Sequence, residues 1–171
     1  MKKYVSAFAI ASLALMFTAC AQQKKTTGGT TKTTKATKAI PGVSYISMER
    51  TSCFGRCPSY QVEIFRNGIV RYTGKQFTEY TGVYEREIEP KDAQKLMKEF
   101  TNYRVDTCKD VYDNMIADIP GIIYGFTIDG KEKKIHNAHF GPKYLQVMAQ
   151  KIDAVAKPGI GWRKVGDLPK Q

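Results

Sequence analysis

Apolar and polar residues alternate with a period of two along the first half of the globular part of the chain, which is typical of strands with one buried face. Residues 43–48 are mostly β-branched or aromatic and predict a first strand. Residues 60–64 and 70–72 alternate on the two sides of Asn67 and Gly68, a pair that favours a type I′ turn. The sequence therefore predicts a β-hairpin at this point.

Two further strands are expected before the pattern changes, over residues 77–80 and 82–88. In the second of them, Glu85, Glu87 and Glu89 recur at every other position, so they share one face of the chain. We interpret this acidic row as a solvated face of the sheet and expect no metal or acid–base role for it.

The hydrophobic period changes to 3.6 after Glu89, which predicts an amphipathic helix over residues 91–102 with Pro90 at its start. A second helix is expected to open at Pro142 and to end at Pro158 and Gly159. The residues that define the two apolar faces are Ala93, Leu96, Met97 and Phe100 in the first helix and Leu145, Met148, Ile152 and Val155 in the second.

Residues 122–128 and 131–136 predict two more strands, with a turn at Asp129 and Gly130. Residues 103–121 are expected to be a connecting segment, and residues 162–171 an irregular tail. Hairpins followed by a helix, then another hairpin and another helix, indicate an α+β fold. We expect an antiparallel β-sheet with two helices packed on one face.

The first 19 residues have the three parts of an export signal: two lysines, an apolar run over residues 5–17, and small residues before Cys20. The run is shorter than the about 20 residues that a transmembrane helix needs. The sequence FTAC resembles the lipobox of bacterial lipoproteins, which implies that Cys20 is lipidated and becomes the new N-terminus. The absence of Asp after Cys20 implies, by the same resemblance, transfer to the outer membrane, and we expect the domain to face the periplasm.

Residues 20–40 comprise the lipidated cysteine and a segment rich in Lys, Thr and Gly, which cannot bury enough apolar surface to fold and is expected to be a flexible tether. Seven of the 27 Lys and Arg residues and none of the 16 Asp and Glu residues precede residue 41, so the net charge of +11 falls to +4 for residues 41–171. The basic run lacks interleaved aromatic residues, and we therefore expect no nucleic-acid partner. Residues 41–171 are expected to form a single α+β domain.

Three cysteines remain once Cys20 is assigned to the lipid: Cys53, Cys57 and Cys108. Export places them in an oxidising compartment, where nearby thiols tend to pair. Gly55 lies in the short loop between the first two and tolerates the dihedral angles that a small ring requires. We therefore favour a Cys53–Cys57 disulfide with Cys108 as a free thiol, and pairings that use Cys108 are the alternative.

The same loop carries a resemblance to a family. The segment CFGxCPxY between two predicted strands, followed by the Asn-Gly turn and by Tyr72 and Gly74, resembles a domain of unknown function found in bacterial envelope lipoproteins, over about residues 43–156. Asp118 and Pro120 resemble a second short motif of that family. The resemblance implies no activity. The residues that match the first motif are Cys53, Phe54, Gly55, Cys57, Pro58 and Tyr60.

A CxxxCP motif also occurs in thioredoxin-like copper chaperones, and two thiolates with an imidazole suit Cu(I). The alternative ligand set is Cys53 and Cys57 with His136, or with His139 in its place. Those chaperones continue from the motif into a helix, whereas residues 60–64 alternate as a strand does. Copper binding or thiol–disulfide exchange is therefore the alternative function, and the main expectation includes no metal and no cofactor.

The chain has no GxSxG, P-loop or HExxH motif, so we expect no enzymatic activity. Four tyrosines offer an aromatic surface for a glycan or a peptide, although aromatic residues of strands are more commonly core residues. They are Tyr60, Tyr72, Tyr80 and Tyr84. The sequence thus predicts a membrane-anchored periplasmic lipoprotein with a non-catalytic binding or structural role. Its expected partners are the membrane, through the lipid, and an envelope protein, glycan or peptide.

Overall fold

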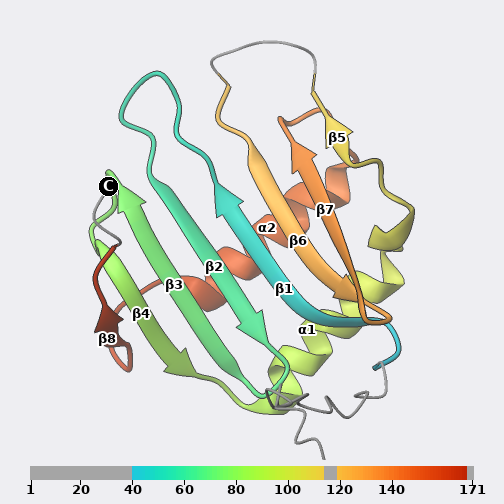
Figure 1. The fold of residues 1–171 in the computed structure, drawn as a ribbon, viewed down its shortest axis with the longest axis horizontal. Helices are drawn as coiled ribbons and strands as arrows, with labels where there is room; N and C mark the ends of the chain where they lie inside the picture. The colour runs from blue at the N-terminus through green and yellow to red at the C-terminus, as the bar shows by residue number, and fades with distance from the viewer. Residues whose placement is uncertain (1–39, 114–118, 169–171) are drawn as a thin grey trace, which may run out of the picture. The chain divides into compact units, whose positions relative to one another are not determined.

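Eight strands form one sheet in the part of the chain that the computed structural model describes, residues 40–113 and 119–168 (Figure 1). The chain divides into two units, Met1–Ala36 and Thr37–Gln171, and every described residue belongs to the second. The expected export signal, Cys20 and nearly all of the tether lie outside the described residues, as does Asp118 of the second motif.

The described elements follow the chain in an order that alternates hairpins with helices. They are β1 (Val43–Arg50), β2 (Ser59–Phe65), β3 (Ile69–Gln76), β4 (Gly82–Glu87), α1 (Pro90–Asn102), a 3₁₀ turn (Val105–Thr107), β5 (Val111–Tyr112), β6 (Ile122–Ile128), β7 (Lys131–Asn137), α2 (Lys143–Ala156) and β8 (Arg163–Gly166). Across the sheet the strand order is β5-β7-β6-β1-β2-β3-β4-β8. The expected α+β class is confirmed.

Every neighbouring pair of described strands is antiparallel except β5 and β7, which are parallel over two residues. The central β1 lies between β2 and β6, so the first and second halves of the domain meet along one strand. Consecutive strands joined by short loops favour this arrangement, since a two- or three-residue loop joins only antiparallel neighbours.

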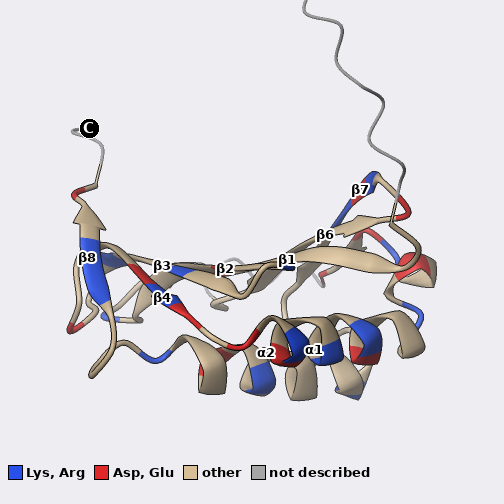
Figure 2. Cartoon of the chain, turned by 90° about the horizontal axis from the view of Figure 1, so that it is seen from below, with Lys and Arg blue, Asp and Glu red and all other residues tan. Residues whose placement is uncertain are grey.

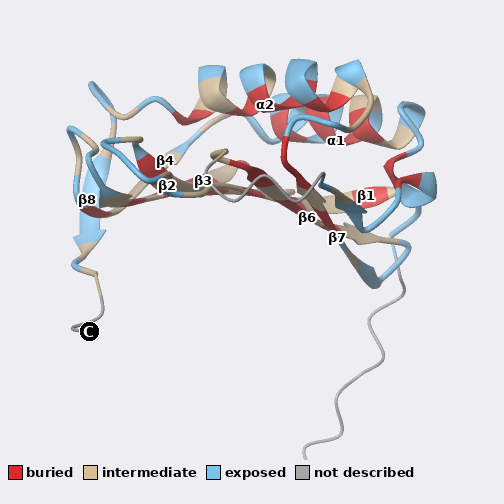
Figure 3. Cartoon of the chain, turned by 90° about the horizontal axis from the view of Figure 1, so that it is seen from above, coloured by how far each residue is buried: buried red, intermediate tan, exposed pale blue. Residues whose placement is uncertain are grey.

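The core is formed by side chains of the sheet that meet the apolar faces of both helices. Phe100 of α1 lies edge-on to Phe126, with ring centroids 5.9 Å apart. Tyr124, two residues earlier on the same strand face, donates a 2.7 Å hydrogen bond to the Leu145 carbonyl of α2. Both helices run along the same side of the sheet in Figures 2 and 3, and Figure 3 shows the buried residues gathered between helices and strands.

Each helix buries the face that the 3.6-residue period indicates. All four residues expected on the inner face of α1 are buried, and Leu145, Met148 and Ile152 of α2 are buried as well, whereas Val155 is half-buried. The outer helix surfaces carry charges of both signs (Figure 2). Lys151 Nζ of α2 donates to Glu99 Oε2 of α1 at 2.5 Å, which joins the helices on their solvent side.

The two predicted hairpins use different turns. Asp129 and Gly130 both have positive φ, and Ile128 pairs with Lys131, as in a two-residue type I′ turn. The type I′ prediction is wrong at Asn67, because only Gly68 has positive φ. There the Gly68 amide donates to the Phe65 carbonyl at 3.0 Å, so the loop has three residues and ends in a left-handed glycine.

Other expectations are also wrong. Residues 77–80 form no strand, because the chain leaves the sheet at Phe77, whose φ is 53°. The tail is not wholly irregular, since β8 pairs with β4, and the connecting segment contributes β5. These pairings depend on partners distant in sequence, which a local pattern does not reveal.

Among the described residues, the two helices are both too short and too polar for a membrane span.

Candidate binding site

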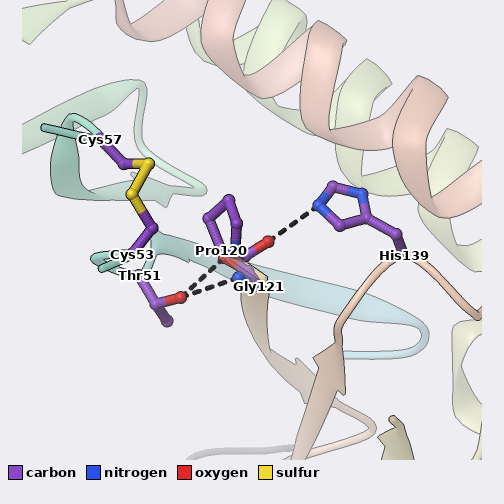
Figure 4. Close-up of a disulfide and its surroundings, with 6 residues drawn as sticks. All are labelled: Thr51, Cys53, Cys57, Pro120, Gly121 and His139. Atoms are coloured by element: carbon purple, nitrogen blue, oxygen red, sulfur yellow. Dashed lines mark hydrogen bonds between the residues drawn. A yellow bond between two sulfur atoms is a disulfide. The ribbon is translucent and has the colours of Figure 1, made fainter. Parts of the chain in front are cut away.

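The loop between β1 and β2 is closed by a disulfide between Cys53 and Cys57, whose Cα atoms are 5.6 Å apart (Figure 4). Phe54 lies inside the ring and is 92% exposed. Such exposure is unusual for a phenylalanine, since burying one contributes about 1.5–3 kcal/mol. The ring thus presents an aromatic side chain to solvent at a fixed corner of the domain.

The base of this loop is joined to the chain that enters β6. The Thr51 amide donates to the Gly121 carbonyl at 3.0 Å, and the Gly121 amide donates back to Thr51 Oγ1 at 2.8 Å. One residue earlier, the Pro120 carbonyl lies 2.8 Å from His139 Nε2 (Figure 4). The described part of the second motif therefore lies beside the first motif.

A cavity of about 420 Å³ begins immediately after the disulfide loop. Its walls come from three parts of the chain: the start of β2, the β3–β4 connection with the neighbouring part of β3, and the end of α2. The aromatic and acidic residues that line it are Tyr60, Tyr72, Phe77, Tyr80, Glu79 and Asp153. Pro58, just before β2, and Lys157, just after α2, also line it. A volume of this size lies within the usual range of small-ligand sites.

The β3–β4 connection lies against the sheet because Gly74 has no side chain. A Cβ atom added there would overlap the Tyr80 carbonyl oxygen. Thr78 Oγ1 donates to the same carbonyl at 3.2 Å and stabilises the loop conformation. These contacts hold Phe77 and Tyr80 at the cavity.

Two residues of the cavity wall, Tyr60 and Asp153, form an ionic and hydrogen-bonded cluster with Arg50, which lies behind the wall and does not line it. Arg50 Nη2 lies 2.5 Å from Asp153 Oδ2, and the Tyr60 hydroxyl donates to Asp153 Oδ1 at 2.7 Å. Burial raises the pKa of Tyr60, and the hydrogen bond to Asp153 raises this pKa further. A phenol is protonated at neutral pH even without this shift, and the raised pKa keeps it a hydrogen-bond donor at more alkaline pH as well.

The aromatic side chains of the site contact one another and their neighbours. The rings of Tyr60 and Tyr72 have centroids 5.3 Å apart, and Tyr80 lies edge-on to Tyr84 at 5.8 Å. Of the four tyrosines singled out in the sequence, the first three line the cavity, and Tyr84 supports one of them. They thus serve both as partners of the core and as walls of the site.

The remaining cysteine lies elsewhere. Cys108 is a free, buried thiol whose Sγ is 3.0 Å from the Tyr144 hydroxyl. Burial raises the pKa of Tyr144, and its hydrogen bond with Cys108 raises it further. This pair has no part in the cavity.

The structure does not group Cys53, Cys57 and His136 as metal ligands. Within residues 40–113 and 119–168, no three or more His, Cys, Asp or Glu side chains come together in a way that could hold a metal ion. His136 is part of β7, where its amide donates to the Asp110 carbonyl at 2.8 Å, and His139 is directed to Pro120.

Sequence reasoning missed several residues of the site. Arg50 and Asp153 form an ion pair although they are 103 positions apart, and neither lies in a motif. The sequence offers only a weak signal for Asp153. This acidic residue directly follows Ile152, which belongs to the apolar face of the second predicted helix. The sequence pattern predicts a strand at Phe77 and Glu79, whereas the structure has both in the loop that lines the cavity.

Comparison with known proteins gives one family. The family model described as "Domain of unknown function (DUF6438)" matches residues 44–156, which agrees with the extent expected from the sequence. Neither the curated proteins nor the solved structures contain a match to this chain.

Proposed function

We propose that this chain, which belongs to the DUF6438 family of domains of unknown function, is an envelope lipoprotein. Its domain binds a partner at the cavity beside the disulfide loop. Cys20 anchors it to the outer membrane, and the domain faces the periplasm. The role is non-catalytic. The observation that carries the proposal is the cavity of about 420 Å³ with four aromatic side chains in its walls.

Several features support binding rather than a purely structural role. Small-ligand sites are concave and mostly apolar, with a few polar groups that fix orientation. Here Asp153 and Tyr60 supply such groups, and each already has a partner that fixes its position. We also propose that both helices pack on one face of the sheet. This packing brings the end of α2 to the strands that line the cavity.

A matched pair of lysines tests binding at the cavity. A photoreactive amino acid is placed at Lys157, which lines the cavity, or at Lys98, which is exposed on α1. We expect crosslinks to envelope components from position 157 in intact cells and none from position 98. Equal crosslinking from both positions, or none from position 157, would contradict the proposed site.

The anchor is tested separately with labelled palmitate. Wild-type protein is expected to incorporate the label, and a Cys20→Ala variant is expected to lose both the label and its membrane fractionation. Label that persists in the variant would show that another residue carries the lipid, and the absence of label in both would refute the lipoprotein assignment.

Thiol–disulfide exchange or copper binding at Cys53 and Cys57 is the competing function. Both cysteines are half-buried and the three residues between them are exposed, which favours it, since exchange needs access to a sulfur atom. Titration of the oxidised protein with a glutathione redox buffer distinguishes the two. We expect the disulfide to persist at the redox poise of the envelope, and ready reduction followed by stoichiometric Cu(I) binding would instead support the competing function.

A further inference from the structure

The charged residues that line the cavity, taken together with Arg50, balance one another. Asp153 is already paired with Arg50, and Glu79 and Lys157 contribute one charge of each sign to the lining. Arg56 does not line the cavity, and its guanidinium lies over the Phe77 ring, 5.7 Å from the centroid. A strongly charged ligand therefore gains little from this site, since attraction to one group is offset by repulsion from another.

The same walls combine flat apolar surfaces with fixed polar atoms. Tyr60, Tyr72, Phe77 and Tyr80 supply ring faces or edges. Asp153 retains acceptor capacity beyond its bonds to Arg50 and Tyr60, because an ionised carboxylate accepts about four hydrogen bonds. Thr78 donates to the Tyr80 carbonyl and can still accept through its hydroxyl oxygen. The complementary ligand is neutral, has an apolar face, and carries several hydroxyl groups at its edge.

Main-chain pairing by an extended peptide is disfavoured at this position. Tyr60 of β2 is opposite Gly74 of β3, and Gly74 is in turn opposite Gly82 of β4. These strands satisfy one another, so the cavity offers no open strand edge to which a peptide could add. A ligand must instead be recognised through its side groups or its ring faces.

We propose that the cavity binds a neutral saccharide built of equatorially substituted pyranose rings. The axial C–H groups of such a ring form an apolar face that stacks on tyrosine, and its hydroxyl groups project at the edge toward Asp153 and Thr78. The half-open cavity of about 420 Å³ accommodates one or two rings of a longer chain. This inference rests on the proposed function and specifies the ligand class of the same site.

Titration with defined oligosaccharides tests the inference on the full lipidated chain, held in a detergent without a sugar headgroup. The probes are the β-1,4-linked tetramer of N-acetylglucosamine, which is neutral, and the corresponding glucosamine tetramer, which is cationic at slightly acidic pH. Tyrosine fluorescence and calorimetry report binding. We expect the neutral tetramer to bind and the cationic tetramer to bind at least tenfold more weakly.

Variants locate the binding. Phe77 is 52% exposed, so Phe77→Ala leaves the core intact and is expected to weaken binding about tenfold through loss of stacking. Tyr80→Ala is expected to do the same, and Tyr80→Phe, which keeps the ring, to retain most of the affinity. Tyr45→Ala is the matched control, because Tyr45 is a half-buried tyrosine that does not line the cavity.

The outcomes separate the saccharide from the site itself. If neither tetramer binds while crosslinks from position 157 persist, the saccharide is wrong and the binding function stands. If the cationic tetramer binds more tightly, the charge argument is wrong. If neither tetramer binds and position 157 gives no crosslinks, both proposals fail.

Discussion

The Tyr60 hydroxyl donates a 2.7 Å hydrogen bond to Asp153 Oδ1, although 93 positions separate the two residues. The bond connects the end of the cysteine motif to α2, so the strand that follows the disulfide and the helix that closes the cavity are positioned together. Arg50, from the strand before the disulfide, binds the other oxygen of the same carboxylate. A single side chain of α2 therefore fixes both strands that flank the loop.

Replacing this carboxylate is expected to destabilise the protein. Asp153→Ala leaves the Arg50 charge half-buried without its partner and removes the acceptor of Tyr60, at a cost of about 1–3 kcal/mol. Urea denaturation measures the free energy of unfolding. Glu132→Ala, at an exposed position of β7, is the control and is expected to change stability by less than about 0.5 kcal/mol. Equal effects of the two variants would contradict the role of the cluster.

Removing the disulfide is expected to have a modest effect because the ring is small. The loop-entropy argument gives about 2 kcal/mol for a double Cys53→Ser, Cys57→Ser variant, measured by urea denaturation. A reductant should lower the stability of the wild type to that of the double variant and leave the variant unchanged. Cys108 is a free thiol and offers nothing to reduce. If the reductant also destabilised the variant, Cys108 would therefore have to be part of a disulfide with another molecule.

Two glycines provide a matched test of the hairpin loop. Gly68 has φ +92°, and an added Cβ would overlap the Ile88 carbonyl oxygen, so Gly68→Ala is expected to cost about 1–3 kcal/mol. At Gly159 an added Cβ meets nothing within 4 Å, so Gly159→Ala is expected to be neutral or slightly stabilising. The midpoints of thermal unfolding compare them. A Gly68→Ala variant as stable as Gly159→Ala would show that the left-handed conformation at Gly68 is not required.

Stability at alkaline pH is expected to depend on Tyr45. Burial raises the pKa of Tyr45 to about 12, and its hydrogen bond to Glu63 contributes in the same direction. The folded protein therefore holds this proton more tightly than the unfolded chain, where tyrosine has a pKa of about 10. The resulting stabilisation is complete below about pH 10 and is lost as the pH rises toward about 12.

A Tyr45→Phe variant isolates this contribution from those of the other tyrosines. The free energy of unfolding, measured by urea denaturation across this pH range, should fall less steeply with pH in the variant than in the wild type. Identical slopes would mean that Tyr45 ionises equally easily in the folded and unfolded states. The ultraviolet absorbance of tyrosinate provides an independent reading of the same titration.

The fold was predictable where a single element contains its own signal. The apolar residues of α1 recur on one face and Pro90 precedes them, so the helix could be located within a residue. The strand pair β6–β7 has alternation on both sides of an Asp-Gly turn. β5 and β8 carry no such signal, because they have two and four residues, and their pairing with β7 and β4 supplies what the sequence pattern lacks.

The candidate site was predictable only in part for the same reason. Pro58 and Tyr60 belong to the cysteine motif, so the amino-acid sequence is sufficient to single them out. Asp153 and Arg50 become significant only when the sheet and α2 bring them together. Phe77 and Tyr80 belong to a run typical of a strand, and the turn that takes them out of the sheet depends on the close approach of that loop to Gly74.

The pairing of β8 with β4 affects how the domain can be shortened. The family match ends at residue 156, before Trp162 and β8, yet Trp162 lies edge-on to Tyr72 and β8 covers the outer side of β4. A protein truncated at residue 156 would expose β4 as a bare sheet edge, and such edges promote aggregation between molecules. The C-terminal boundary for recombinant expression is therefore beyond Gly166, although the family match ends at residue 156.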